Sequence, residues 1–342
     1  MADANLHRLF RRLALFATGF ALVVVILGAF TRLSDAGLGC PDWPGCYGHL
    51  AWPDEVHEID QANTAFGRPV EVHKAWKEMV HRYFAGTLGL LIATLFVLAL
   101  VNRRDPRQPV ALPLALLGLV IFQAMLGMWT VTLQLKPLVV MGHLLGGFAT
   151  LSLLWWLAIG ASPGLTARHE TSLRLLPWAI LGIVILVAQI ALGGWTSSNY
   201  AALACPDFPM CQGQWWPHMD YAEGFVLWRG LGVNYEFGVL EHPARTAIHM
   251  THRIGALVTA CYLGVFTLSA IRVSARDAVV RRLAAVVLVL LVTQVLLGIS
   301  NIEFGLPLSV AVLHNATAAL LLLSLLALTL SLVRGVGART AI

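Results

Sequence analysis

Charged residues are scarce in this sequence. Only 12% of its 342 residues are Asp, Glu, Lys or Arg, whereas 58% are hydrophobic. A soluble domain carries about twice that share of charge, so a soluble globular protein is excluded. The sequence also lacks Asn-Gly hairpin signals and alternating ten-residue apolar segments, which excludes an outer-membrane barrel. It contains neither a Walker A loop nor a strand-associated GxGxxG, so no nucleotide site is expected.

Long apolar segments are what the sequence has instead. Eight of them approach or exceed the roughly 20 residues with which an α-helix spans a bilayer. We therefore predict an all-α polytopic membrane protein with eight transmembrane helices. The first segment lacks an A-x-A cleavage site, and we expect it to be a retained helix. The predicted spans are 12–32, 77–101, 110–131, 138–160, 174–196, 246–271, 282–300 and 309–333.

The few charges are distributed unevenly between the two sides of the membrane. With the N-terminus inside, the cytoplasmic segments hold 14 of the 23 cations but only 4 of the 18 acids. The positive-inside rule then predicts that both termini are cytoplasmic. The net charge of +5 follows from this topology, and no nucleic-acid partner is needed to explain it.

Similar motifs recur along the chain at two fixed spacings. The segments QAMLGMWT and QVLLGISN lie 171 residues apart, and CPDWPGC and CPDFPMC lie 165 apart. We predict two tandem four-helix bundles, 1–165 and 166–342, in the same orientation because each contains an even number of spans. The spacing of 171 relates His81 to His252, His143 to His314, Gln123 to Gln294 and Gly127 to Gly298.

Four histidines are expected at similar depth on the even-numbered spans. They are His81, His143, His252 and His314. Ionisable groups inside a membrane face the bundle interior and mark functional sites. Small residues stand three or four positions later, on the same helical face, and leave room for a flat group. They are Ala85, Gly146, Gly147, Gly255, Ala256 and Ala318.

Two facing imidazoles in each half are typical of bis-histidine haem ligation. Three other interpretations stay open. Each histidine can simply hydrogen-bond a neighbouring helix, as we also expect for Gln123 and Gln294. Two histidines per half leave a tetrahedral zinc site incomplete. Copper would want thiolate or thioether ligands, which Met79, Met141 and Met250 could supply only loosely.

The motifs EMVHR and HR, the histidines on even-numbered spans and the external cysteine pairs together resemble the haem A synthase family. The resemblance covers essentially the whole chain. It implies an oxidoreductase that converts the C8 methyl group of haem O to a formyl group, giving haem A for cytochrome oxidase. It also implies a bacterial inner-membrane location, with the haem sites towards the outer side.

The resemblance also implies different roles for the two halves. The N-terminal half would be catalytic, with Glu78, His81 and His143 around the substrate haem. The C-terminal half would hold a permanent haem b through His252 and His314. Expected partners are the lipid bilayer, a haem O-supplying enzyme, oxidase assembly factors and an electron partner that no motif specifies. A homo-oligomer stays open.

The halves differ beside these histidines. Glu78 lies three residues before His81, whereas the corresponding position in the second half is His249, to which we assign no ligand role. A buried carboxylate is suited to exchanging protons, but a salt bridge to Lys74 or Arg82 also explains Glu78.

Arg82 and Arg253 each follow a predicted ligand directly. A guanidinium group suits the propionates of a haem. Extension of the side chain to the outer headgroups explains both arginines equally well.

Four cysteines form two pairs on the outer side, Cys40 with Cys46 and Cys205 with Cys211. Disulfides persist on that side. A structural staple is one interpretation, and the resemblance implies a role of the first pair in haem handling or redox chemistry. We expect Cys261 to be a small core residue.

Two rival functions remain. A di-haem cytochrome b-like electron carrier fits the histidine pairs equally well, although a symmetric carrier has little need for Glu78. A haem exporter or chaperone is disfavoured by fixed ligands in a parallel repeat.

Overall fold

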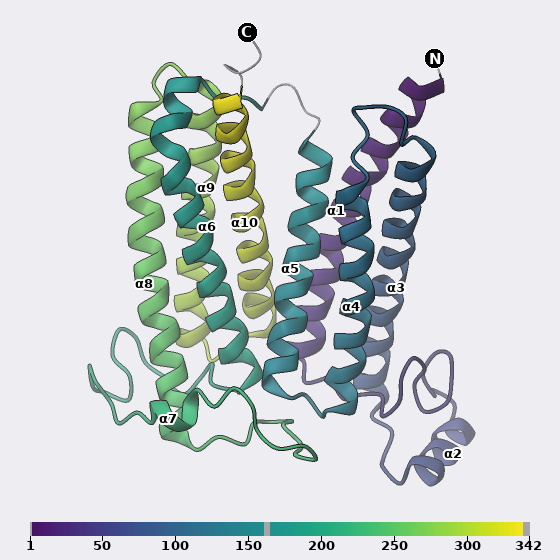
Figure 1. The fold of residues 1–342 in the computed structure, drawn as a ribbon. Helices are drawn as coiled ribbons and strands as arrows, with labels where there is room; N and C mark the ends of the chain where they lie inside the picture. Colours follow the sequence, from purple (N-terminus) through teal and green to yellow (C-terminus); the bar gives the residue numbers. More distant parts are fainter. Residues whose placement is uncertain (1, 161–164, 338–342) are drawn as a thin grey trace.

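The computed structural model describes residues 2–160 and 165–337, and within them the chain forms a long bundle of helices (Figure 1). Arg339, one of the arginines predicted to be cytoplasmic, lies outside the described residues. No β-strand occurs in the described ranges. The helices are α1 (Ala2–Leu33), α2 (Val56–Phe66), α3 (Val72–Val101), α4 (Ala111–Thr132), α5 (Pro137–Gly160), α6 (His169–Ser198), α7 (Tyr221–Gly224), α8 (His242–Val273), α9 (Ala278–Glu303) and α10 (Leu308–Gly337).

Eight of these helices are long and apolar enough to cross a membrane, which confirms the predicted fold class. The helices extend beyond the apolar segments from which they were predicted. A 30-residue helix such as α3 is about 45 Å long, whereas the hydrocarbon core is roughly 30 Å thick. The extra turns carry polar residues into the headgroup region, where a search for apolar residues alone does not find them.

The two short helices, α2 and α7, were not predicted. Both belong to the loops between spanning helices, on the side opposite the N-terminus (Figure 1). α2 ends at Gly67, which adopts a left-handed conformation with φ of 61° and donates its N–H to the carbonyl of Asn63. A glycine in this position is a common helix terminator and was an available signal.

The spanning helices contact one another in two groups of four. Helices α1, α3, α4 and α5 form one closed ring, and α6, α8, α9 and α10 form the other. The rings meet where α5 contacts α6, α1 contacts α10, and α5 contacts α10. These contacts are consistent with the predicted division into two bundles. The α1 N-terminus and the end of α10 lie at one end of the molecule, and the longest loops lie at the other (Figure 1).

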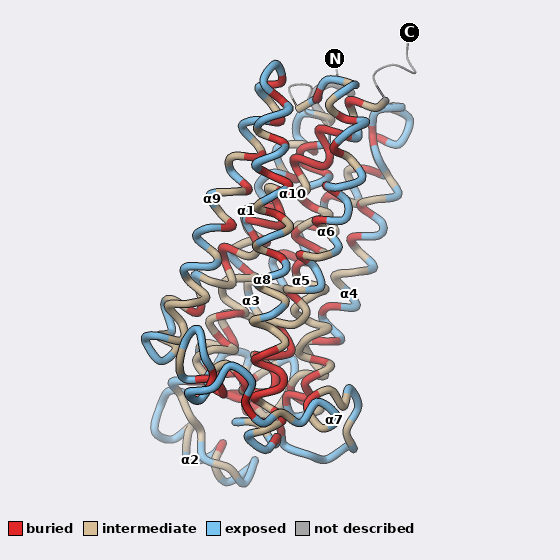
Figure 2. Tube along the Cα trace, turned by 90° about the vertical axis from the view of Figure 1, so that its left-hand side faces the viewer, coloured by how far each residue is buried: buried red, intermediate tan, exposed pale blue. Residues whose placement is uncertain are grey.

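Helix α10 forms the centre of the packing. In its most apolar stretch 72% of residues are buried, against 17–33% in the other spanning helices. Figure 2 shows buried positions running along the middle of the bundle. The indole of Trp155 on α5 donates a hydrogen bond of 2.9 Å to the carbonyl of Leu323 on α10. The two groups are therefore joined within the span as well as at its ends.

Candidate functional site

Each of the four histidine rings lies against a glycine of a neighbouring helix. A Cβ atom added at Gly28 on α1 would stand 3.0 Å from Cε1 of His81 on α3. A Cβ atom at the corresponding glycine would stand 3.2–3.4 Å from Cε1 of each of the other three histidines, so each ring packs tightly against a position without a side chain. The remaining pairs are Gly127 with His143, Gly193 with His252, and Gly298 with His314.

These glycines share the spacings of the repeat. Gly28 and Gly193 are 165 residues apart, and Gly127 and Gly298 are 171 apart. Both pairs lie in segments that define the repeat, the first in LGAFT and LGGWT, but their contact with the histidines was not predicted. The available signal was the recurrence of a glycine at each spacing.

The histidines are placed in two pairs. His81 lies within electrostatic range of His143, and His252 within range of His314. All four occur within about the first three turns of helices that start at the loop-bearing end. Each is partly buried. The structure thus brings together the predicted ligands of each half.

Several ring nitrogens are buried without a hydrogen bond. Among the described residues, Nδ1 of His81, His143 and His314 has no partner. Buried polar groups in proteins are nearly always hydrogen-bonded, so these three nitrogens are open to a further partner. A pair of imidazoles in each half suits haem iron, which needs only two axial ligands. Within 2–160 and 165–337, no group of three or more His, Cys, Asp or Glu side chains is placed to hold a metal ion.

Glutamine side chains accompany three of the histidines. Gln294 lies 3.1 Å from Nε2 of His314, and Gln189 lies 3.0 Å from Nδ1 of His252. Gln123 fills the space at Gly146, where a Cβ atom would clash with its amide. Gln123 and Gln294 were predicted to make contacts between helices. The partner of Gln294 is now identified as His314, a predicted ligand. Gln189 was missed because it has no counterpart in the first half.

Two of the small residues expected to leave room for a flat group do not do so. Gly146 is filled by Gln123, and Gly255 is filled by Gln189. The reason is that a vacant position on a helix is open to any neighbouring side chain, and the sequence does not show which one faces it. Gly147 differs, because a Cβ atom there would meet only Val25, at 3.9 Å.

Glu78 and His249 occupy equivalent positions and bind equivalent groups. The Glu78 carboxylate accepts the backbone N–H of Cys40 at 3.0 Å and a guanidinium N–H of Arg82 at 2.5 Å. In the second half, the backbone N of Cys205 lies 3.2 Å from Nδ1 of His249, and Nε of Arg253 lies 3.2 Å from its Nε2. A neutral imidazole accepts a hydrogen bond at only one of these two nitrogens. A carboxylate and an imidazole thus face the same two groups in the two halves, but only the carboxylate accepts from both.

The two arginines are committed to the cysteine loops. Arg82 donates to the carbonyls of Asp42, Pro44 and Gly45. Arg253 donates to those of Cys205, Asp207 and Met210. Glu78 forms its ion pair with Arg82, whereas Lys74 pairs with Glu71 and Glu236. Of the two salt bridges considered for Glu78, the one to Arg82 is present.

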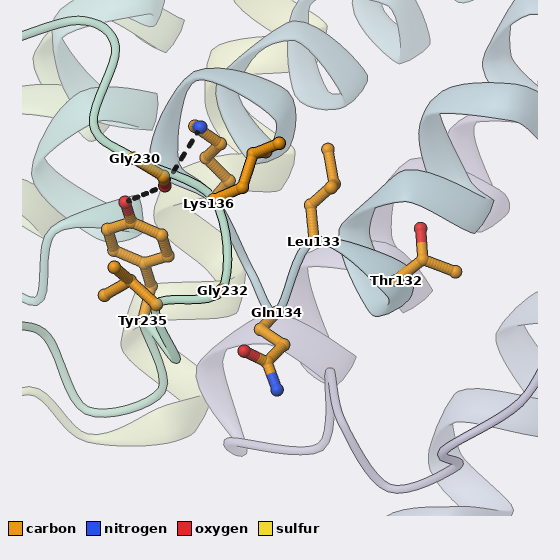
Figure 3. Close-up of a pocket in the computed structure, with 9 residues that line it drawn as sticks. Thr132, Leu133, Gln134, Lys136, Gly230, Gly232 and Tyr235 are labelled. Atoms are coloured by element: carbon orange, nitrogen blue, oxygen red, sulfur yellow. Dashed lines mark hydrogen bonds between the residues drawn. The ribbon is translucent and has the colours of Figure 1, made fainter.

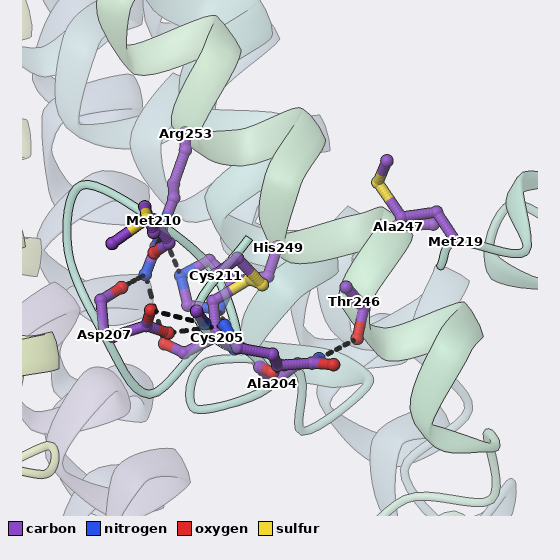
Figure 4. Close-up of a disulfide and its surroundings, with 12 residues drawn as sticks. Ala204, Cys205, Asp207, Met210, Cys211, Met219, Thr246, Ala247, His249 and Arg253 are labelled. Carbon is purple, nitrogen blue, oxygen red and sulfur yellow. Dashed lines mark hydrogen bonds between the residues drawn. A yellow bond between two sulfur atoms is a disulfide. The ribbon is translucent and has the colours of Figure 1, made fainter. Parts of the chain in front are cut away.

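Both predicted cysteine pairs are disulfide-bonded, Cys40 to Cys46 and Cys205 to Cys211. Figure 4 shows the second disulfide beside His249 and Arg253. Cys261 differs from the expectation: it is exposed on α8, because that helix turns this position away from its neighbours.

An aspartate closes each disulfide loop. Asp207 accepts the backbone N–H groups of Gln212 and Gly213 at 2.5 and 2.9 Å, and Asp42 does the same for Tyr47 and Gly48. The N–H group of Gly213, and then that of Gln212, lowers the pKa of Asp207 below its usual range.

The long loop between α7 and α8 crosses from the second group of helices to the first. Its Tyr235 is 2% exposed and packs with Leu38, Val131 and Leu135 of the first group. Lys136, at the start of α5, donates to the carbonyl of Arg229 at 2.5 Å. Figure 3 shows Lys136 and Tyr235 on either side of Gly230 in the same small crevice. The loop-bearing end of the N-terminal half is therefore contacted by a loop of the C-terminal half.

Comparison with known proteins identifies the family of this chain. The profile of the COX15-CtaA family, described as cytochrome oxidase assembly protein, matches residues 11–326. The chain belongs to this family. It is 49% identical over 308 residues to the heme A synthase of Shewanella oneidensis, covering 90% of this chain and 91% of that protein. It is 30% identical over 326 residues to the heme A synthase of Caulobacter vibrioides, covering 89% of each chain.

Family membership and the eight spanning helices make this chain a multi-pass membrane protein of the cytochrome oxidase assembly family. The matched region contains all four histidines, Glu78 and both disulfides.

Proposed function

We propose that this protein is a haem A synthase, which oxidises the C8 methyl group of haem O to a formyl group. Conversion of the methyl group and one water to the formyl group releases four protons and four electrons. Dioxygen is the alternative source of the formyl oxygen. The family match and the two heme A synthases of similar length support this reaction.

One structural observation carries the assignment of the catalytic half. The two halves share the histidine-on-glycine arrangement, but only the first has a carboxylate one turn from its histidine. In the proposed site His81 and His143 position the substrate haem. Glu78 accepts and releases protons, and Arg82 with the N–H of Cys40 holds its carboxylate in place.

The second half is proposed to hold haem b between His252 and His314. When bound, this group supplies one-electron transfer. Arg82 and Arg253 are proposed to lie at the propionate edge of each site, where they add positive charge and keep the adjoining loop closed.

The proposed setting is the bacterial inner membrane, with both termini in the cytoplasm and the haem sites towards the outer side. The reaction requires an enzyme that supplies haem O and an acceptor for the released electrons. Its product would pass to cytochrome oxidase assembly factors.

The test is to express the protein with a source of haem O and to identify the haems that are extracted after purification. Haem A beside haem B is expected from the unaltered protein. Glu78→Gln should lower haem A formation at least 100-fold, the lower range for loss of a proton-transferring group, while haem B is retained. His252→Ala should instead remove haem B.

A di-haem electron carrier is the second candidate, since the equal histidine pairs fit two permanent haems. Two haem B per chain in every variant with intact histidines, without haem A, would establish the carrier and overturn the synthase.

A further inference from the structure

The strongest difference between the halves, apart from Glu78, is a glutamine on α6. Nε2 of Gln189 lies 3.0 Å from Nδ1 of His252 and 3.1 Å from the backbone carbonyl of the same residue. The side chain therefore contacts both the ring and the helix that carries it. Its Oε1 is buried and has no hydrogen-bond partner among the described residues.

The space for this glutamine is provided by Gly255, one turn after His252. A Cβ atom there would stand 2.3 Å from Oε1 of Gln189. The corresponding residues of the first half are Val24 and Phe84. Phe84 stacks on Phe20, with ring centroids 5.4 Å apart. Both positions therefore differ together between the halves. The second half has Gln189 with Gly255, and the first half has Val24 with Phe84.

We propose that Gln189 is a positioning residue that fixes the His252 ring for haem iron, and that the first half lacks such a residue. The proposal rests on the proposed function in one respect, because His252 must be a haem ligand. A hydrogen bond on one imidazole nitrogen fixes the orientation of the ring and leaves the other nitrogen for the metal.

The amide group has the chemistry for this role. In the ring form that binds iron through Nε2, Nδ1 carries a proton and needs an acceptor. As placed, Nε2 of Gln189 donates to the His252 carbonyl and faces Nδ1. A turn of the terminal amide presents Oε1, which lacks a partner, to the Nδ1–H and gives up the bond to that carbonyl.

The presence of Gln189 in only one half agrees with the different residence times proposed for the two haems. Nδ1 of His81 has no hydrogen bond, whereas Nδ1 of His252 faces Gln189. The contrast concerns this pair of equivalent ligands, because Nδ1 of His314 in the second half also has no partner. An unlocked ligand suits a site that must accept substrate and release product. A locked ligand suits a cofactor that stays bound through many turnovers.

The test uses the full-length protein, purified in detergent with its haem. Gln189→Met keeps the length of the side chain without an acceptor, and Gln189→Glu keeps an acceptor oxygen. Val187→Met, at an exposed position of the same helix, is the matched control. Two properties are measured: the rate at which haem b passes to excess apomyoglobin, and its midpoint potential.

Gln189→Met should speed haem b loss about 10- to 100-fold, the usual effect of removing a partner of a metal-bound histidine. It should also raise the midpoint potential, because the imidazole becomes a weaker donor to ferric iron. Gln189→Glu should restore slow loss and a low potential, and Val187→Met should change neither.

An unchanged rate of haem b loss and an unchanged midpoint potential in Gln189→Met would overturn the proposal. Equal changes in Gln189→Met and Gln189→Glu would also overturn it, because they would show that Gln189 acts through packing alone. Haem b that survives His252→Ala would refute the ligand assignment itself, and the role of Gln189 with it. Haem b that depends on His252 but not on Gln189 would refute only the role of Gln189.

Discussion

At the scale of single residues, the four glycines under the histidine rings set the geometry of both sites. We predict that Gly28→Ala displaces the His81 ring, because the new methyl group would lie 3.0 Å from its Cε1. Overpacking of this kind costs about 1–3 kcal/mol. Bound haem O should fall by roughly 10-fold or more while haem b is unaffected, as measured from the haems extracted from purified protein.

Gly19→Ala is the matched control for this change. It lies on the same helix, and a Cβ atom there would meet nothing within 4 Å. Equal haem O contents in the two variants would show that Gly28 has no role in seating the histidine.

Residue identities were largely predictable at this scale, whereas their partners were not. The four histidines and Glu78 stand out because membrane segments rarely contain such groups. The cysteine pairs stand out because the CPDWPGC motif recurs as CPDFPMC. The neighbours of His252 depend on how α6 and α8 are rotated about their axes. That rotation is set by packing between helices, which one sequence does not reveal. Only the recurrence of Gly28 and Gly193 at the repeat spacing was available as a hint.

At the scale of elements, each disulfide loop is a small folded unit closed by an aspartate. The N–H groups of Gln212 and Gly213 stabilise the charged form of Asp207, which lowers its pKa. The resulting stabilisation is present above the usual carboxyl pKa of about 3.9. It is lost as the pH falls through the lower pKa of the folded loop.

Asp207→Asn should therefore speed reduction of Cys205–Cys211 by a phosphine several-fold at pH 7, and the difference from the unaltered protein should shrink as the pH falls below the usual carboxyl range. Rates are measured by alkylating the released thiols and locating them by mass. Asp42→Asn should affect only Cys40–Cys46, which serves as the crossed control. Equal reduction rates of Cys205–Cys211 in Asp207→Asn and the unaltered protein at pH 7 would contradict this account.

Elements differ in how far the sequence predicts them. The spanning helices follow from length and hydropathy, since a bilayer imposes both. α2 and α7 lie in water-facing loops, where no such constraint acts, and they were missed. The Glu78–Arg82 ion pair was foreseen as one alternative. The carbonyl partners of Arg82 and Arg253 were missed, because they come from backbone whose path depends on the folded loop.

At the scale of the whole molecule, the loop that carries Tyr235 joins the two groups of helices. Tyr235→Ala should lower the free energy of unfolding by about 3 kcal/mol, as expected for loss of a buried aromatic side chain. It should also expose residues 225–240 to protease, and the measurement is the rate of cleavage in detergent. The buried position is 2% exposed.

Tyr221→Ala is the comparison, since Tyr221 precedes the same loop but is 42% exposed. Its effect should stay within about 0.5 kcal/mol, as for most surface substitutions. Equal protection of the loop in both variants would contradict a role for Tyr235 in joining the halves.

The overall architecture was predictable because the chain repeats itself, but the contact between the halves was not. The crossing loop has no counterpart of equal length in the first half, so the repeat gives no information about it. Lys136, which anchors this loop, stands between two apolar segments, and nothing in the sequence distinguishes it from other cations at helix ends.

The crossing loop also has a consequence for the order of biosynthesis. The ribosome completes α1 to α5 well before residues 225–240 emerge, so Lys136 is synthesised without its acceptor carbonyls at Arg229 and Gly230. The loop-bearing end of the first bundle therefore lacks this contact until α6 and the following loop have been made. The gap belongs to the interval between synthesis of the two halves and ends when the second half folds against the first.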